Sequence, residues 1–270
     1  MAAPTPAEDV LDQQPEDIAT RAEAVGEERL GRSNRDIFIT GLVAGVEVSL
    51  GGLAAMTVVG AAQESVPGLR LYGALALGGL AFPMGFLFVI LGRSELFTEN
   101  FLIPVMALLN RERSLRSLVE LWALSWLGNL LACAGMALLL SQSGAVGEPI
   151  LDGYRAYTEY KLALAPHAVF LSAILAGMVM TVLTWLLLAV REPVAKILCI
   201  FAAGYLLFAA NLSHSIVGAA VLFVGYHLAG RGLVDVLRWV GMATLGNLLG
   251  GVAFVTVLRL AQVAERRRSQ

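Results

Sequence analysis

The sequence predicts an all-α membrane protein of six transmembrane helices, arranged as two inverted three-helix repeats with a broken second and a broken fifth helix. Three observations predict it: few charged residues, regularly spaced apolar stretches and an internal duplication. Of the 270 residues, 57% are hydrophobic and 15% are charged, whereas soluble domains carry about 25% charged residues. Membrane β-barrels need strands of alternating polarity, which the sequence lacks, so helices are expected to cross the bilayer.

Apolar stretches long enough to span a bilayer occur six times. A helix needs about 20 apolar residues to cross the hydrocarbon core. The stretches cover about 37–62, 71–109, 118–140, 166–190, 197–223 and 236–258. The second and the fifth are too long, or too interrupted by polar residues, for one continuous helix, and we expect each of them to be broken.

The two ends of the chain differ from this transmembrane domain, which we place at 36–260. Residues 1–35 are polar and acidic and lack the basic start and short apolar core of a secretory signal. In this tail we expect an unstructured segment over 1–15 and a short helix over 16–31. The last ten residues form a short basic tail, 261–270.

Lysine and arginine residues indicate the orientation in the membrane. With six spans, thirteen of them fall on the side of the two termini and five on the other side, while Arg93 is left within the membrane. Because basic loops stay in the cytoplasm, both termini are expected to be cytoplasmic. We therefore expect an integral multi-pass protein of the bacterial cytoplasmic (inner) membrane.

An internal duplication divides the transmembrane domain into two halves. The pentapeptide Leu-Gly-Asn-Leu-Leu occurs at 127–131 and again at 245–249, an offset of 118 residues. The same offset aligns two polar interruptions, 94–100 in the second span and 212–218 in the fifth. Chance could produce one short match, but two matched features at one offset favour duplication. Three spans per half invert the second half, and inverted repeats with broken helices mark the sites of transporters.

His214 is the leading candidate for a functional residue, because it lies deep within the fifth span. An ionisable group inside a bilayer is costly and is a functional candidate by default. Imidazole can donate or accept hydrogen bonds, or change its charge near neutral pH. A neutral histidine that joins two helices is the structural alternative. In the first interruption, Thr98 offers a rotatable hydroxyl.

Charged and amide side chains surround the interruptions. We expect Glu95 and Glu99 to accept hydrogen bonds from freed backbone amides or to pair with Arg93 at the end of the broken helix. Asn129 and Asn247 follow the paired glycines, where an asparagine usually joins helices or satisfies a neighbouring loop.

Bulky apolar residues flank the interruptions: Phe82, Phe86, Leu96, Phe97 and Leu207. Apolar constrictions on either side of a polar midpoint slow ions and admit small neutral or weakly hydrated species. Ordinary core packing is the alternative for any single one of them.

The sequence lacks the motifs of several function classes. It has no nucleotide fingerprint, no metal-ligand cluster and no pairing of a nucleophile with a base. We therefore expect no cofactor, no bound metal and no enzymatic activity. The net charge of −2 does not favour nucleic acid as a partner.

Four motifs together resemble the formate/nitrite transporter family, including its YfdC-like branch. Residues 94–100 are similar to the family's loop in the second span, and 213–216 to its histidine loop in the fifth. Residues 126–129 and 245–251 resemble its third and sixth spans. The resemblance covers about 35–260.

The resemblance implies an aquaporin-like protomer with its own pore, assembled as a homopentamer in the lipid bilayer. Members move small monovalent anions or their weak acids, often with a proton. By this resemblance, His214 is the central pore histidine and Thr98 its hydrogen-bonding partner. Lys161 is a vestibule lysine that attracts anions, and Asn247 contacts the histidine loop. Four of the five bulky residues, Phe97 excepted, form the two apolar constrictions.

Four positions depart from the family's pattern and concern sites that surround its pore. Glu99 stands where the family commonly has glycine, and Ser213 where it often has an acid. Gly177 and Gly218 stand where it has asparagines. Three functions therefore remain open: a channel-like, proton-linked transporter of small anions or weak acids, a facilitator of water or neutral solutes, and a membrane interaction or regulatory protein with a vestigial pore. Glu99 favours the second, and the acidic tail and the missing asparagines favour the third.

Overall fold

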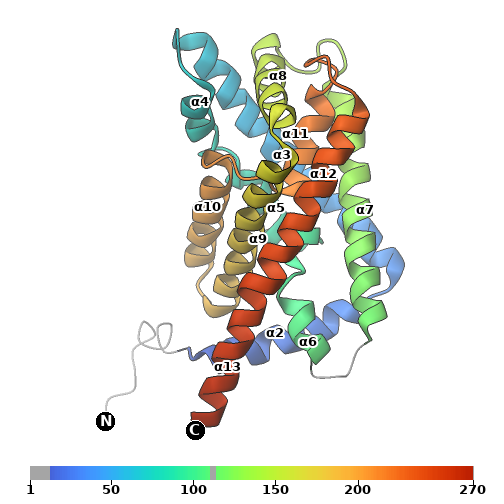
Figure 1. Ribbon diagram of the computed structural model, residues 1–270, viewed down its shortest axis with the longest axis vertical. Coiled ribbons are helices and arrows are strands. Elements are labelled where there is room, and N and C mark those ends of the chain that lie inside the picture. Colours follow the sequence, from blue (N-terminus) through green and yellow to red (C-terminus); the bar gives the residue numbers. More distant parts are fainter. Residues whose placement is uncertain (1–12, 110–113, 270) are drawn as a thin grey trace.

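Long apolar helices run from one end of the molecule to the other (Figure 1). The computed structural model describes residues 13–109 and 114–269. In this part, five helical segments are long and apolar enough to cross a membrane: Asn34–Ser65, Leu71–Gly92, Leu115–Leu140, Pro166–Ala189 and Leu233–Arg268. Two shorter apolar helices, Pro193–Ala209 and Ser215–Gly225, make up the remaining apolar stretch.

The uninterrupted spans are α3 (Asn34–Ser65), α7 (Leu115–Leu140) and α9 (Pro166–Ala189). The sixth span begins as α12 (Leu233–Leu248), widens into the π-helical segment η2 (Leu249–Thr256) and ends as α13 (Val257–Ser269). The all-helical membrane fold predicted from the sequence is thus confirmed. The final ten residues, expected as a tail, continue this helix up to Ser269.

The second and fifth spans are broken, as predicted. The second consists of α4 (Leu71–Gly78), α5 (Pro83–Gly92), the single 3₁₀ turn η1 (Phe97–Glu99) and α6 (Ile103–Leu109). The fifth consists of α10 (Pro193–Ala209) and α11 (Ser215–Gly225). Proline at the first position of α5 and of α10 starts these half-helices, because its fixed φ suits a first turn and its missing amide is not needed there.

Glycines bring the outer helices of each half into close contact at matching places. A Cβ atom on Gly45 would lie 2.5 Å from the carbonyl oxygen of Asn129, and one on Gly177 would lie 2.2 Å from that of Asn247. The first contact joins α3 to α7 and the second joins α9 to α12, so the two halves use the same packing. Small residues permit such backbone approach between helices in lipid.

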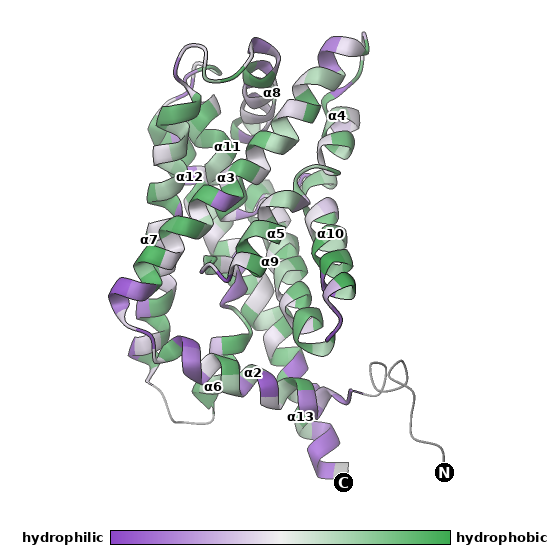
Figure 2. Ribbon diagram, turned by 180° about the vertical axis from the view of Figure 1, so that it is seen from behind, coloured by the Kyte–Doolittle hydropathy of each residue, from purple (hydrophilic) through white to green (hydrophobic). Residues whose placement is uncertain are grey.

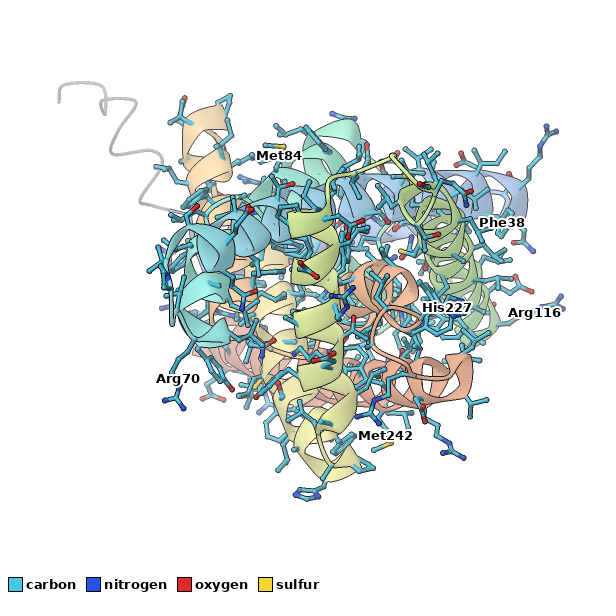
Figure 3. All side chains as sticks on the ribbon, turned by 90° about the horizontal axis from the view of Figure 1, so that it is seen from above. Phe38, Arg70, Met84, Arg116, His227 and Met242 are labelled. Carbon is cyan, nitrogen blue, oxygen red and sulfur yellow. The ribbon has the colours of Figure 1, made fainter. Side chains whose placement is uncertain are left out.

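The two ends of the bundle carry different additional helices. At one end lie both described termini, with α2 (Pro15–Leu30), α6 and α13; at the other lies α8 (Glu148–Ala163) (Figure 1). Figure 2 shows hydrophobic residues along the bundle and hydrophilic ones on α2 and at the end of α13. Seen from above, Arg70 and Arg116 extend away from the bundle (Figure 3).

The short helix predicted for 16–31 is present as α2, whereas most of the segment expected to be unstructured lies outside the described residues. Buried residues of α2, among them Ile18 and Ala22, pack against Leu102, Met106 and Trp185. The acidic segment is therefore partly built into the fold. The sequence prediction missed α8, whose low overall hydrophobicity gave no sign of a membrane helix.

Candidate functional site

The two helix breaks have the same backbone geometry at equivalent positions of the duplication. The chain enters the first loop at Arg93 (φ 59°) and the second at Asn211 (φ 53°), which are 118 residues apart and are the two non-glycine residues with positive φ in the described chain. In each loop the next amide bonds the carbonyl five residues before it, at 3.0 Å. A left-handed residue followed by such a bond terminates a helix.

Asn129 and Asn247 hold these loops from behind. Asn129 accepts a hydrogen bond from the amide of Phe97 (2.9 Å) and donates to carbonyls of α3 and of its own loop. Asn247 accepts from the amide of Ser215 (2.8 Å) and donates to carbonyls of α9 and of the histidine loop. The predicted contact of Asn247 with the histidine loop is present. Because both of its polar atoms bind backbone, Asn247 holds the histidine loop in place.

Thr98 and His214 meet where the two loops face each other. Oγ1 of Thr98 lies 2.8 Å from Nε2 of His214, and both side chains are buried. The two residues come from opposite halves of the duplication. The structure therefore brings together the two residues that the sequence singled out in the separate interruptions.

The hydrogen bonds of His214 determine its tautomer. Nδ1 lies 3.1 Å from the amide nitrogen of Val217, at the start of α11. A backbone N–H can only donate, so Nδ1 accepts, and a neutral ring then carries its proton on Nε2. Nε2–H donates to Oγ1 of Thr98, which leaves the threonine hydroxyl proton to be donated elsewhere. A second proton on Nδ1 would break the bond that caps α11.

Aromatic rings pack on one side of this pair. The ring centroids of Phe86 and His214 are 5.9 Å apart. Phe86 meets Phe82 edge to face at 4.9 Å, and Phe82 stacks on Phe208 at 5.1 Å. Phe208 was not selected from the sequence, because nothing there distinguishes it from other apolar residues of α10.

The other predicted constriction residues are buried as well. Leu96, Phe97 and Leu207 are at most 3% exposed. The ring of Phe97 lies edge to face against Phe101 at 5.1 Å, and Phe101 in turn contacts Trp122. Phe97 therefore anchors its loop in the packing between the loop and α7.

Lys161 lies on α8 and reaches the end of α10 from the side of the molecule opposite the termini. Its Nζ is fully buried and donates to the carbonyl of Asn211 (2.7 Å), with the rings of Tyr157 and Trp239 at 5.5 and 5.6 Å. The carbonyl groups at a helix C-terminus favour a cation. Burial acts in the other direction and lowers the pKa of Lys161 to about 7.

Buried polar atoms without a protein partner gather on this same side. Nε1 of Trp239, the side-chain amide of Asn211 and the hydroxyls of Ser213 and Thr158 have no hydrogen-bond partner among the described residues. Buried polar groups are otherwise almost always paired, so such atoms mark places for water or a polar solute. Trp239 and Asn211 were missed because the sequence does not show which residues lie next to Lys161.

The ion pairs of the first loop differ from the prediction. Glu95 pairs with Arg32 (2.5 Å) and Arg29 (3.4 Å), and it also accepts from Nδ2 of Asn100 (2.7 Å). The predicted partner, Arg93, is exposed rather than buried in the membrane, and it ends α5 through its left-handed backbone. The cations come from α2 and the turn after it, which the sequence did not connect with the loop.

A cavity of about 550 Å³ opens beside this loop at the end of the molecule that carries the termini. We call it the termini-end cavity; basic and acidic side chains line it together: Arg29, Arg32, Arg93, Lys196, Glu28, Glu95 and Glu99. Glu99 is 7% exposed, and its Oε1 has no hydrogen-bond partner among the described residues. The prediction that Glu99 pairs with Arg93 or with a freed amide finds no support in the described contacts of Oε1.

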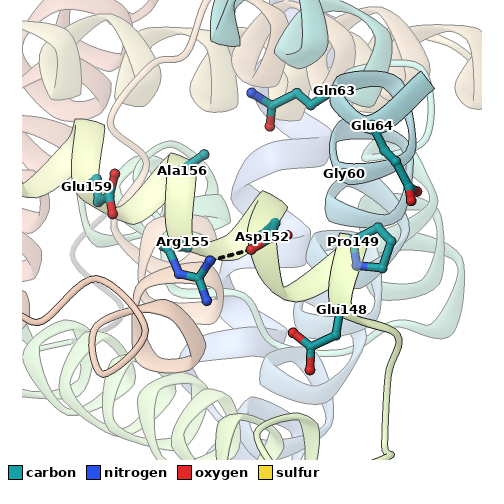
Figure 4. A pocket seen from close by; sticks show the side chains of 9 residues that line it. All are labelled: Gly60, Gln63, Glu64, Glu148, Pro149, Asp152, Arg155, Ala156 and Glu159. Atoms are coloured by element: carbon teal, nitrogen blue, oxygen red, sulfur yellow. Dashed lines mark hydrogen bonds and ion pairs between the residues drawn. The ribbon is translucent and has the colours of Figure 1, made fainter. Parts of the chain in front are cut away.

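A second cavity, of about 540 Å³, lies between α3 and α8 (Figure 4). Four of its nine lining residues are acidic, and one of these, Asp152, forms an ion pair with Arg155. None of the residues of the Thr98–His214 pair lines it. In the described part of the chain, no group of three or more His, Cys, Asp or Glu side chains is arranged to hold a metal ion.

Two of the departures from the family's pattern, Gly177 and Gly218, are packing positions. Gly177 faces the backbone of Asn247, and a Cβ atom on Gly218 would lie 2.2 Å from the ring of Trp239. Neither position has room for an asparagine side chain. Their small size is required by the approach of α12.

Comparison with known proteins gives one consistent answer. The family model described as Formate/nitrite transporter matches residues 16–261. The chain is 28% identical over 248 residues to the "Formate channel BtFdhC" of Bacillus thuringiensis, covering 89% of this chain and 92% of that protein. It is 25% identical over 244 residues to the "Inner membrane protein YfdC" of Escherichia coli (strain K12), covering 88% and 75%.

Solved structures have the same fold. An "FNT family ion channel" matches with a TM-score of 0.80 at 21% identity, over 91% of this chain and 98% of that chain. A "Pentameric formate channel with formate bound" matches with a TM-score of 0.68 at 18% identity, over 84% and 96%. Together with the family match over nearly the whole described chain, the broken helices and the facing loops lead to one conclusion: the chain belongs to the formate/nitrite transporter family.

Proposed function

We propose that this protein is a channel-like transporter of small monovalent anions or their weak acids, such as formate and nitrite, in the bacterial cytoplasmic membrane. The observation that carries the proposal is the buried Thr98–His214 pair, which lies where the two broken helices meet and beside the rings of Phe82 and Phe86. The names of related proteins, among them a formate channel and a nitrite transporter, support this substrate class.

The pair supplies hydrogen-bond donors at an otherwise apolar midpoint. His214 donates to Thr98, so the threonine hydroxyl can donate to an oxygen atom of the substrate. A bare anion loses its hydration between apolar side chains at high cost, whereas the neutral acid does not carry that cost. Hydrogen bonding by a neutral His214 is therefore the role that its contacts favour, rather than donation of a proton.

Lys161 attracts the anion from the side opposite the termini. In the described part of the chain no carboxylate lies within ion-pair distance of its ammonium group, so its charge is not cancelled locally. A cation at the mouth of a narrow path raises the local concentration of anions. We infer that the substrate passes Lys161 before or after it contacts the Thr98–His214 pair.

We further propose a homopentamer with both termini in the cytoplasm. Support comes from the structurally similar pentameric formate channel and from the excess of basic residues on the side of the termini. Many large apolar side chains, including Leu138 and Leu258, are exposed on the protomer surface. Such side chains suit contact with lipid and with neighbouring protomers. Light scattering of the detergent-solubilised protein is expected to give five times the 28.6 kDa chain mass.

The direct test is uptake by proteoliposomes. Formate, nitrite and acetate are offered at external pH 5.5 and 7.5, with empty liposomes as the control. We expect uptake of at least one of them, faster at the lower pH because the neutral fraction of a weak acid grows roughly tenfold per pH unit. Uptake equal to that of empty liposomes for every solute at both pH values contradicts the proposal.

A facilitator of neutral solutes or water is the second candidate function, and the buried carboxyl group of Glu99 at the termini-end cavity favours it. A carboxylate near the mouth disfavours anions. Osmotic shrinkage of the same vesicles separates the two. Faster shrinkage with water or glycerol but no anion uptake would establish this candidate in place of the first.

A further inference from the structure

Glu99 is a buried carboxyl group whose Oε1 takes no part in the hydrogen bonds and ion pairs that hold its loop. The neighbouring Glu95 is fully engaged by Arg29, Arg32 and Asn100. Glu99 is 7% exposed, and its Oε1 has no partner among the described residues. A buried carboxylate without a paired cation is costly. Glu99 therefore either carries a proton or has a function that offsets this cost.

The position of Glu99 connects the termini-end cavity to the pair at the centre. Glu99 lines the cavity and directly follows Thr98, in the same 3₁₀ turn. Thr98 binds His214, whose Nδ1 is occupied by the amide that it caps. His214 therefore has no spare proton to give to an anion. If a weak acid crosses in its neutral form, another group must supply the proton at this mouth.

We infer that Glu99 exchanges a proton with a small weak-acid substrate, such as a monocarboxylic acid, at the termini-end mouth of the pore. This inference rests on the proposed function. The protonated Glu99 carboxyl gives its proton to the oxygen of the substrate anion, which leaves a Glu99 carboxylate and a neutral acid. A hydronium ion in the cavity then returns a proton to Glu99 and becomes water. In the opposite direction, Glu99 first releases its proton to cavity water; the neutral acid then gives its proton to the Glu99 carboxylate and leaves as the anion.

The charges that face Glu99 fit this exchange. Those that line the cavity are Glu28 and Arg29 of α2, Arg32, Arg93 and Glu95 of the loop, and Lys196 of α10, while α5, α6 and α9 line it with uncharged residues. Glu47 of α3 adds a further negative charge close to Glu99. The exposed Arg93 and the half-buried Lys196 hold an anion near the mouth, whereas Arg29 and Arg32 are committed to Glu95. An ionised Glu99 repels a bare anion at the last step before Thr98, so passage is tied to proton transfer.

The test measures the charge moved per formate molecule. Proteoliposomes containing the wild-type protein, Glu99→Gln or Glu28→Gln are assayed for labelled formate uptake and for transport current at the same pH. Glu28→Gln is the matched control, because it removes the same charge from an exposed position of the same cavity. Glu99→Asp retains a carboxyl group at the site. Assembly is checked by gel filtration, and Glu99→Ser replaces Glu99→Gln if the amide does not assemble.

We expect wild type, Glu28→Gln and Glu99→Asp to move little charge per formate molecule. The neutral Glu99 variant is expected to take up formate at least tenfold more slowly by the electroneutral route. It is also expected to carry several-fold more charge per formate molecule. An unchanged ratio and rate in the neutral variant overturns the inference while leaving the proposed function intact. The same change in Glu28→Gln also overturns it, because the effect then belongs to the cavity as a whole. If wild type shows no uptake, the proposed function fails and this inference fails with it.

Discussion

At the scale of single residues, His214 has two tasks that its two ring nitrogens divide. Nδ1 caps α11 by accepting from the amide of Val217, and Nε2 faces Thr98. The sequence placed His214 deep in a span but left open whether it stabilises the fold or serves transport. The contacts show that a single ring orientation caps the helix and presents a donor to the other half, and we propose that this donor serves transport.

Substitutions that keep or remove the cap separate these tasks. Asparagine is a good N-cap residue, whereas alanine is not, and loss of a cap costs about 1 kcal/mol. We expect His214→Asn to keep the thermal stability of the wild type within a few degrees but to lose most formate uptake. His214→Ala is expected to lose both. Melting followed by fluorescence, together with uptake, checks this, and full transport by His214→Asn would refute the role of Nε2.

Lys161 predicts a specific pH dependence. Because burial lowers its pKa to about 7, the ammonium charge is present below that pH and is lost as the pH rises through it. We expect Lys161→Met to reduce formate uptake about tenfold at pH 6, where the wild type is charged, and much less at pH 8. Arg155→Gln, on the same helix but at the acidic cavity, is the control. An equal effect of Lys161→Met at both pH values would contradict this role.

At the scale of elements, the two loops are built alike and held alike. Each half has a left-handed residue at the helix end, an asparagine behind the loop and a glycine that lets the asparagine-bearing helix approach. The 118-residue offset seen in the sequence predicted the two breaks and the two asparagines. It could not predict that Gly177 corresponds to Gly45, because the first span of each half follows a different offset.

The asparagines supply the element-scale prediction. Replacing Asn247 by leucine leaves one amide and two carbonyls unpaired in a buried place, at roughly 1–3 kcal/mol each. We expect Asn247→Leu and Asn129→Leu to destabilise the protein by similar, large amounts and to lower the melting temperature. Gln142→Leu, at an exposed helix end, is the control. A variant with unchanged melting behaviour would show that the loops hold themselves.

The contacts of α2 are an example of what could not be predicted from the sequence. The segment was expected to be an acidic tail, yet its basic residues decide the structure, because Arg29 and the following Arg32 bind Glu95 across more than 60 positions of the chain. Local patterns reveal periodicity and polarity but not which distant charges meet. The partner of Glu95, the lining of the termini-end cavity and the surroundings of Lys161 all depend on such long-range contacts.

At the scale of the whole molecule, an inverted duplication brings two polar loops to one point inside an apolar bundle. The spans, the breaks and the facing of His214 and Thr98 follow from hydrophobicity, an internal offset and the resemblance of motifs, which is why the fold was predictable. The family match and the similar channel structures agree with that architecture. The central claim is that solute passes at the Thr98–His214 pair.

The most direct measurement of that claim compares two threonine variants in proteoliposomes. Thr98→Val removes the hydroxyl that faces His214, and Thr184→Val makes the same change at a buried threonine of the termini-end cavity whose hydroxyl bonds only the carbonyl of Met180, on its own helix. Formate uptake is expected to fall at least tenfold in Thr98→Val and to stay above half of the wild-type rate in Thr184→Val. Equal rates in the two variants would place the path of the solute away from the Thr98–His214 pair.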